Sequence, residues 1–248
     1  MRRIPYFLLI SSLLLAASDA SAFRFSPFRS KFEPSGPQAN QLFLVENNTD
    51  VPASVQIRIA TRQVDVDGVE VNQDDEKNFT IYPAQMILPP HKSRSVRVQW
   101  TGDPNLKQEK AYRIIAEQLP VNLSKEKPKG SSVKFLVSYR GALFVTPPGL
   151  SQNVALDFFG VTQDREQKKM LEFVFHNRGA KHALLRNLKL VLKDDKGDTV
   201  TLADEKELKG VTGEGILAEH RRRFLLPWPK NLHGTPKQVD FTFDKQAF

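Results

Sequence analysis

The stretch VKFLVSYRGALFV, Val133–Val145, has the alternation of a β-strand in its first half. One face of this strand would present four apolar or aromatic residues, Val133, Phe135, Val137 and Tyr139. The other face would present Lys134, Leu136, Ser138 and Arg140. Alternation of this kind predicts a strand with two different faces. The preceding segment, SKEKPKGSS, is basic and flexible and forms no core of its own, which leaves open what the strand pairs with.

Short runs of the same character recur along the chain, and no convincing helix pattern interrupts them. Before this stretch they are Gln41–Glu46, Ala53–Ala60, Phe79–Ile81, Arg94–Trp100 and Ala111–Leu119. After it they are Asn153–Val161, Lys169–His176, Leu188–Leu192, Thr199–Leu202, Arg223–Leu226 and Gln238–Phe243. Turn-forming residues such as those of NNTDVP separate the runs. Frequent short strands joined by turns indicate an all-β fold built of β-sandwiches.

The segment QVDVDGVEV consists of two alternating halves around Asp67-Gly68. An Asp-Gly pair between such halves predicts a β-hairpin. The acidic residues also suggest part of a calcium loop, but the ligand spacing and the distal glutamate of an EF-hand are missing. We therefore predict a hairpin at this position.

The chain divides into three parts. Residues 1–22 combine two arginines, an apolar run and the small-x-small sequence Ala20-Ser21-Ala22, which predicts a cleaved secretory signal peptide. The apolar run is short for a membrane span, so we expect no stable membrane insertion. Thr146-Pro147-Pro148-Gly149 interrupts the strand pattern. It predicts a short proline-rich linker between a first domain, residues 23–146, and a second domain, residues 147–248.

The composition restricts the classes of function. The 248 residues have a formal net charge of +8 and contain no cysteine, so no disulfide holds the fold although export implies an oxidising compartment. An exported chain rarely meets nucleic acid, and the positive charge therefore indicates anionic partners or a solvated surface. The histidines are scattered, and the motifs of nucleophilic, phosphate-binding and dinucleotide-binding sites are missing. We predict that the protein is not an enzyme and needs no cofactor, metal or nucleic acid.

Several segments resemble a known family. In YPAQMILPPHKSRSVRVQW, Tyr82–Trp100, a proline-bearing turn leads to a strand that contains Val96-Arg97-Val98. In QEKAYRIIAEQLP, Gln108–Pro120, a Glu-x-x-aromatic strand ends in a hydrophobic residue and proline. Both are similar to the periplasmic pilus-assembly chaperones of the PapD-like type. VSYRGALFV resembles the last strand of that family's first domain, but Gly141 replaces the usual proline. The polar segment before this strand, and a lysine of the family that this chain lacks, suggest a divergent branch.

The resemblance implies two immunoglobulin-like β-sandwich domains and a role in pilus assembly. Members of this family lend the last strand of the first domain to a pilus subunit whose own sandwich lacks one, and backbone hydrogen bonds then satisfy the subunit's open edge. The donor residues implied here are Val133, Phe135 and Val137. Their alternation fits equally a strand whose apolar face covers this protein's own core, and that alternative stays open.

The resemblance also implies that basic residues between the domains bind the subunit's terminal carboxylate through charge-assisted hydrogen bonds. The segment SPFRSKFEPSG resembles the family's first strand and puts the first of these anchors at Arg29. Leu136 occupies the position of the family's second anchor, a lysine. Arg113 and Lys134 are therefore the candidates for the second charge, and an ordinary surface role is the alternative for each.

The predicted function is that of a periplasmic chaperone whose partners are pilus subunits and an outer-membrane usher. The alternative class is an exported two-domain β-sandwich adhesin or ligand-binding module, with its function on loops at the tips of the sandwiches. The two classes differ in whether an edge strand or a group of loops forms the binding surface.

Overall fold

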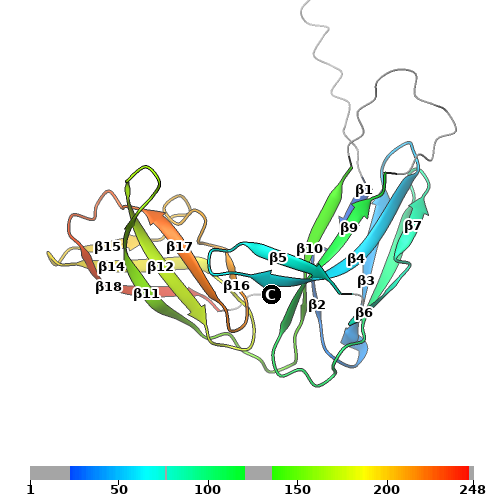
Figure 1. Ribbon diagram of the computed structural model, residues 1–248, viewed down its shortest axis with the longest axis horizontal. Coiled ribbons are helices and arrows are strands. Elements are labelled where there is room, and N and C mark those ends of the chain that lie inside the picture. Colours follow the sequence, from blue (N-terminus) through cyan, green and yellow to red (C-terminus); the bar gives the residue numbers. More distant parts are fainter. Residues whose placement is uncertain (1–22, 76, 121–135, 246–248) are drawn as a thin grey trace, which may run out of the picture.

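The computed structural model describes residues 23–75, 77–120 and 136–245. In these residues the strands form two β-sandwich domains that follow one another along the chain (Figure 1). The described part contains no helix with the length and apolar character needed to cross a bilayer. The prediction of an all-β fold with two sandwiches is confirmed.

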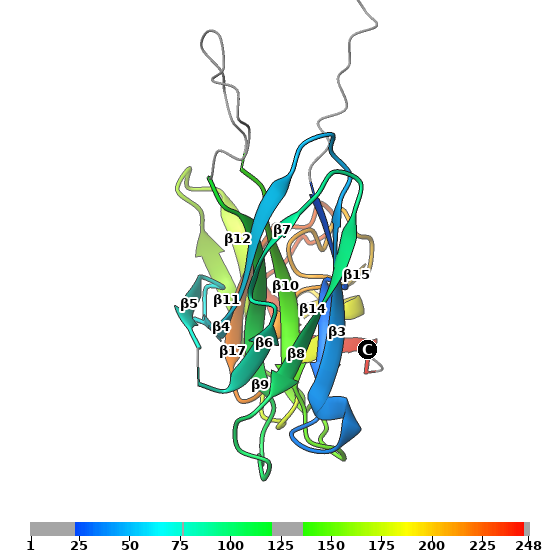
Figure 2. The ribbon, with the colours of Figure 1, turned by 90° about the vertical axis from the view of Figure 1, so that its right-hand side faces the viewer.

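The first domain, in front of the second in Figure 2, consists of two sheets. One has the strand order β1-β3-β8-β6, and the other has the order β2-β10-β9-β4-β5, with β7 also paired to β4. We call the latter the cleft sheet. The strands are β1 Phe23–Ser26, β2 Arg29–Phe32, β3 Asn40–Asn47, β4 Ala53–Val64, β5 Glu70–Asp74, β6 Phe79–Tyr82, β7 Gln85–Leu88, β8 Ser93–Trp100, β9 Lys110–Gln118 and β10 Ser138–Val145.

Alternation along these strands buries one face of each sheet. In β4 every second residue from Ala53 to Ile59 is buried, as expected for a strand with one face on a core. Aromatic rings fill much of the space between the sheets: Phe79 lies with its ring centroid 5.0 Å from that of Trp100 and 5.0 Å from that of Tyr112. Edge-to-face pairs of this kind add to the burial of their apolar area, so the sandwich is held together without a disulfide.

The second domain has a separate core. Its sheets have the orders β11-β12-β17, β13-β16 and β15-β14-β18. The strands are β11 Val154–Gln163, β12 Lys169–Asn177, β13 Ala183–Leu184, β14 Arg186–Asp194, β15 Thr199–Leu202, β16 Gly215–Ile216, β17 Arg221–Pro227 and β18 Pro236–Asp244. Residues 146–153 belong to no strand, and we propose to keep the domain boundary near Pro147.

One predicted strand is shorter than expected. β10 begins at Ser138, so the prediction was wrong for Leu136 and Val137, while Val133 and Phe135 lie outside the described residues. The neighbouring strand β9 ends at Gln118, whose N–H still donates to the carbonyl of Val137 at 2.9 Å. Pro120 follows two residues later and has no N–H to extend the ladder.

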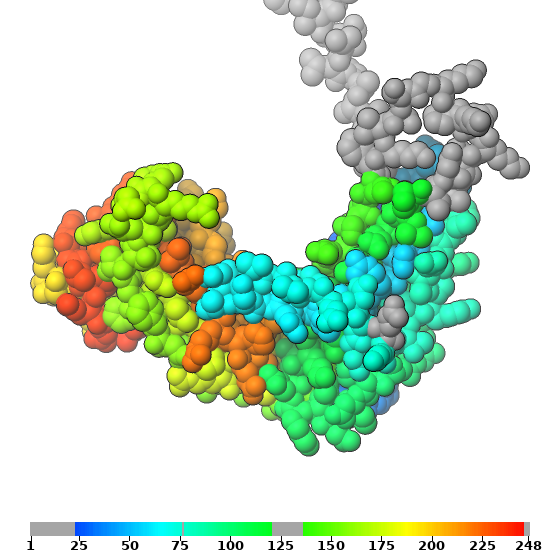
Figure 3. All heavy atoms as spheres, viewed as in Figure 1, coloured from blue at the N-terminus to red at the C-terminus, as the bar shows by residue number. Residues whose placement is uncertain are grey.

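The predicted hairpin around Asp67-Gly68 is confirmed, because Val64 of β4 pairs with Glu70 of β5. Its tip reaches the second domain, where it lies against β17 (Figures 1 and 3). There the backbone N–H of Arg223 donates to the carbonyl of Val66 at 2.6 Å, and Nε of Arg223 donates to Oδ1 of Asp67 at 2.6 Å. The hairpin therefore links the cleft sheet to the edge of a sheet in the other domain.

Gly68 provides a test of this link. It has a φ of 86°, and a Cβ at this position would overlap the guanidinium of Arg222. We expect Gly68→Ala to lower the free energy of unfolding by about 2 kcal/mol, because a left-handed alanine is strained and Arg222 has to move. Gly36 is the matched control, since it has a φ of 77° with open space around the added Cβ, and Gly36→Ala should cost about 1 kcal/mol. If urea denaturation gives both variants the same loss in free energy of unfolding, the contact between the hairpin tip and Arg222 does not contribute to stability.

Candidate functional site

The cleft sheet presents a row of arginine and alanine on the face that points away from the first core. The register pairs Arg29 of β2 with Ala142 of β10, and Ala142 with Arg113 of β9. Arg113 is paired in turn with Ala60 of β4. Directly paired residues lie on the same face of a sheet. The strands therefore hold Arg29 and Arg113 on either side of Ala142, whose small side chain leaves space between them.

Two more arginines join this face by alternation, because Arg140 precedes Ala142 by two residues and Arg62 follows Ala60 by two residues. The four arginine side chains line a cavity of about 340 Å³ between the domains. The second domain contributes His182, Leu184, Gly213, Glu214 and Gly215 to its lining. The cavity is therefore rich in positive charge.

Glu70, at the start of β5, binds two of these arginines. Nε of Arg113 donates to Oε1 of Glu70 at 2.6 Å, and an Nη of Arg113 donates to Oε2 at 2.5 Å. Nε of Arg62 donates to the same Oε2 at 2.8 Å. Burial alone would raise the pKa of the Glu70 carboxyl, but the hydrogen bonds and charges of Arg113 and Arg62 outweigh it and lower the pKa to about 2.

The crowding of positive charge also affects Arg62. Burial lowers the pKa of its guanidinium, and repulsion from Arg113 lowers it further, although the hydrogen bond to Glu70 acts in the opposite direction. Glu70 therefore stabilises a pair of cations that would otherwise repel each other across the strands β4 and β9.

The other two arginines of the cavity are unpaired. Arg29 and Arg140 are exposed, and the guanidinium of neither has a hydrogen bond or an ion pair with any residue that the structure describes. A guanidinium offers donors in a planar fork that matches a carboxylate or a phosphate. The arrangement can therefore bind an anionic group over Ala142, between two domains that partly exclude water.

Strand β10 borders this cavity and has two neighbours along only half of its length. Ser138–Val145 pair with β9 throughout, whereas only Ala142–Val145 pair with β2. The N–H of Ala142 donates to the carbonyl of Phe28 at 2.8 Å, and within the described part of the chain Ser138–Gly141 have no strand on that side. An unpaired strand edge of this kind can accept a strand from another chain.

A buried polar contact joins the two domains beside the arginine-lined cavity. Oε1 of Glu109 lies 2.9 Å from the backbone nitrogen of His182 and 2.7 Å from its ring Nδ1. Oε2 accepts a hydrogen bond of 2.7 Å from the hydroxyl of Thr146. The ring of Phe144 stacks on that of His182 with a centroid distance of 4.0 Å. These contacts fix the second domain beside the arginine cavity.

The sequence-predicted site residues fall into three groups. Arg29 and Arg113 come together at the cavity. Val137 is partly buried and packs against the first core. For this residue the structure matches the alternative in which the apolar face of the strand covers the protein's own core. Val133, Phe135 and Lys134 lie outside the described residues.

Three residues at the cavity were missed by the sequence analysis: Arg62 and Arg140, which line it, and Glu70, which binds Arg62 and Arg113. Glu70 stands on the second arm of the predicted hairpin, Arg62 stands directly before its first arm, and Arg140 stands within the predicted strand. Their alternation was visible, but the pairing of β4 with β9 and of β10 with β2 was not. The signal that could have found them is the cluster of arginines on strands that share one sheet.

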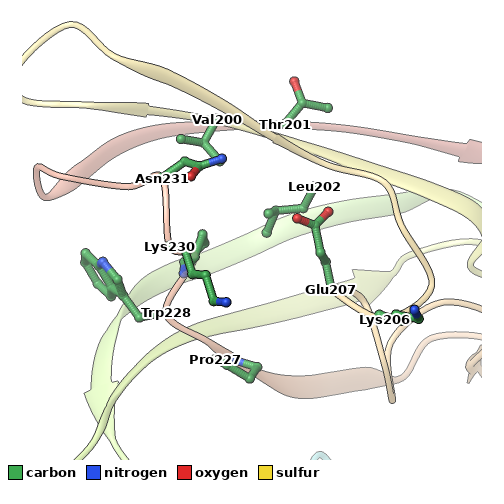
Figure 4. Close-up of a pocket in the computed structure, with 10 residues that line it drawn as sticks. Val200, Thr201, Leu202, Lys206, Glu207, Pro227, Trp228, Lys230 and Asn231 are labelled. Carbon is green, nitrogen blue, oxygen red and sulfur yellow. The ribbon is translucent and has the colours of Figure 1, made fainter.

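A second cavity, of about 470 Å³, lies in the second domain (Figure 4). It is bounded by β15, by the segment that contains Lys206 and Glu207, and by the loop after β17, where the indole N–H of Trp228 donates to the carbonyl of Leu232 at 2.9 Å. Its buried floor is apolar, with Val200 and Leu202. A loop cavity at this place is what the ligand-binding alternative predicts.

Comparisons with known proteins relate the first domain to one family. The family model of pili and flagellar-assembly chaperones, PapD N-terminal domain, matches residues 29–151. No curated protein sequence matches the chain.

Solved structures share the fold over most of the chain. The CsuC–CsuE chaperone–tip adhesion subunit pre-assembly complex of Acinetobacter baumannii contains a chain with 16% identity and a TM-score of 0.59, covering 90% of this chain and 97% of that chain. A chaperone–tip adhesin complex of CFA/I fimbriae biogenesis gives 17% identity and a TM-score of 0.56, covering 90% and 95%. The class 5 fimbriae chaperone CfaA gives 14% identity and a TM-score of 0.55, covering 90% and 100%. At these identities the likeness concerns the fold.

Proposed function

We propose a function from the premise that this chain belongs, through residues 29–151, to the PapD-like family of pilus-assembly chaperones. The protein is exported to the periplasm by a cleaved signal peptide, residues 1–22. There it binds pilus subunits, completes their sandwich with an edge strand and delivers them to an outer-membrane usher. It acts by binding, without catalysis and without a cofactor.

The observation that supports this proposal best is the open edge of β10 next to the arginine-lined cavity. A pilus subunit with an open groove needs backbone hydrogen bonds along a strand, and Ser138–Gly141 offer them on the side that β2 leaves free. Two unpaired arginines, Arg29 and Arg140, lie beside this edge. They can fix a terminal carboxylate and thereby set the register of the added strand.

The donor segment is proposed to include Val133, Phe135 and Val137, which stand in the sequence directly before β10. Alternate side chains of a donated strand fill pockets in the groove of the subunit, while the backbone supplies the hydrogen bonds. Val137 packs partly against the first core in the absence of a subunit, so its contribution requires that the strand turn its apolar side to the subunit on binding.

The test of the proposed function is co-expression of the full-length protein with a small secreted subunit encoded beside its gene. We expect the two proteins to copurify from the periplasm, and the subunit to be degraded or aggregated when it is expressed alone. Recovery of equal amounts of soluble subunit with and without this protein would overturn the proposal. It would favour the ligand-binding alternative, which the loop cavity of the second domain supports.

In the same assay, Phe135→Asp is expected to reduce recovery of the subunit strongly, because a carboxylate buried in an apolar groove without a partner is costly. Phe135→Leu is the control and should retain most of the recovery, since it keeps an apolar side chain. The free Phe135→Asp protein should melt like the wild type. Unfolding of the free variant would instead show that Phe135 belongs to the protein's own core.

A further inference from the structure

Glu70 is a carboxylate that already binds the arginines of the cavity. Both of its oxygens are engaged, Oε1 by Arg113 and Oε2 by Arg113 and Arg62. This is the paired, planar geometry that a carboxylate ligand obtains from arginine. Arg113 therefore has its guanidinium fork occupied by a group of the same protein, although its side chain lines the cavity.

We infer that Glu70 is a built-in competitor of the client's carboxylate, which keeps Arg113 out of the ligand site and leaves Arg29 and Arg140 to the incoming group. The inference rests on the proposed function, because it takes the ligand of the cavity to be the carboxylate of a client. In this view Glu70 is the residue that limits the affinity of the cavity for a carboxylate.

The charge of the competitor is permanent under ordinary conditions. Because its pKa is about 2, Glu70 is ionised at neutral and mildly acidic pH. It thereby cancels part of the positive field that four arginines create in the cavity. Removing its charge leaves that field stronger and frees Arg113 to turn toward an anion.

The position of Glu70 depends on a contact between its hairpin and the second domain. Glu70 is the first residue of β5, which is the outermost strand of the cleft sheet and pairs only with β4. Its hairpin is fixed at the tip by the hydrogen bonds from Arg223 to Val66 and Asp67. Arg113 stands on β9, inside the sheet. The position of Glu70 is therefore tied to the second domain as well as to the cleft sheet.

The test compares acetate binding by the wild type, Glu70→Gln and Glu117→Gln, with acetamide as the neutral analogue. Glu117 is the matched control, because it stands on the same face of β9 as Arg113 but binds Arg58, at 3.2 Å, which does not line the cavity. Binding is measured in the full mature protein from the shifts of the arginine Nε–H signals in nuclear magnetic resonance spectra during titration with sodium acetate.

We expect Glu70→Gln to bind acetate about three- to tenfold more tightly than the wild type, since one more charge-assisted fork becomes available. Glu117→Gln should bind acetate like the wild type, and acetamide should bind to none of the three. Equal acetate affinity for Glu70→Gln and Glu117→Gln would overturn the inference, as would weaker binding by Glu70→Gln.

A second variant keeps the inference testable if Glu70→Gln does not fold. Glu70→Asp retains the charge but shortens the side chain by one methylene, so it should tighten acetate binding by about twofold through a looser grip on Arg113; no change would overturn the inference. Copurification of a subunit separates the two proposals. Copurification with unchanged acetate affinity defeats only the role of Glu70, whereas tighter acetate binding without copurification defeats only the proposed function.

Discussion

Replacing Arg29 by alanine is expected to reduce the amount of subunit recovered with this protein by about tenfold or more. An arginine that meets a carboxylate forms paired, charge-assisted hydrogen bonds, and hydrogen bonds to charged groups contribute about 1.5–3 kcal/mol. Arg29 is exposed, and its guanidinium has no partner among the described residues. Its loss should therefore leave the melting temperature of the free protein nearly unchanged. Copurification and a thermal melt of the same preparation check both parts.

The matched variants define the anchor further. Arg29→Lys should restore recovery only partly, because a point charge does not reproduce the planar fork. Arg113→Ala, Lys134→Ala and Arg140→Ala, tested in parallel, show which residue supplies the second charge. The competition by Glu70 predicts a larger loss for Arg140→Ala than for Arg113→Ala. Normal subunit recovery from the Arg29→Ala protein would remove the anchor assignment and the proposed register with it.

Replacing Glu109 by alanine is expected to lower the free energy of unfolding by about 3–5 kcal/mol, because it removes three buried hydrogen bonds and each such loss costs about 1–3 kcal/mol. The side chains of Glu109 and His182 are 1% and 3% exposed. Without the carboxylate, the backbone N–H of His182, its ring nitrogen and the hydroxyl of Thr146 lose their common partner. Each buried donor left without an acceptor adds to the loss.

Urea denaturation of Glu109→Ala measures this effect, with Glu109→Gln as the control. Glutamine keeps one acceptor oxygen and nearly the same volume, so a smaller loss is expected. A loss of less than about 1 kcal/mol for Glu109→Ala would mean that the contact between the domains stabilises the fold no more than an exposed pair does.

The strands were predictable where alternation is long and bounded by turns. β4 and β12 were expected from their apolar periodicity, and the hairpin from its Asp-Gly pair. β1 and β7 were missed: each has four residues, so its period of two rests on two residues per face, although β15, which is equally short, was found. β13 and β16 consist of two residues each and exist only because they pair with one another.

The cavity was predictable only in part, because it depends on register. Arg29 was found through the resemblance of its segment to a first strand. The neighbourhood of Arg29, Ala142 and Arg113 follows from a parallel pair and an antiparallel pair of strands. Local propensity contains no information on which distant strands pair, so the sequence could name two of the arginines without showing what surrounds them. The carboxylate of Glu70 was overlooked for the same reason.

The parallel pair of β2 and β10 also has a consequence for the order of events during biogenesis. It joins residues more than a hundred positions apart, such as Arg29 and Ala142, and β10 contributes Leu143 and Val145 to the first core. Contacts this distant in sequence form slowly, since the loop between them has to close first. The first domain therefore cannot complete its fold before β10 has been synthesised, and under the proposed export this delay favours a chain that is still unfolded when it reaches the membrane.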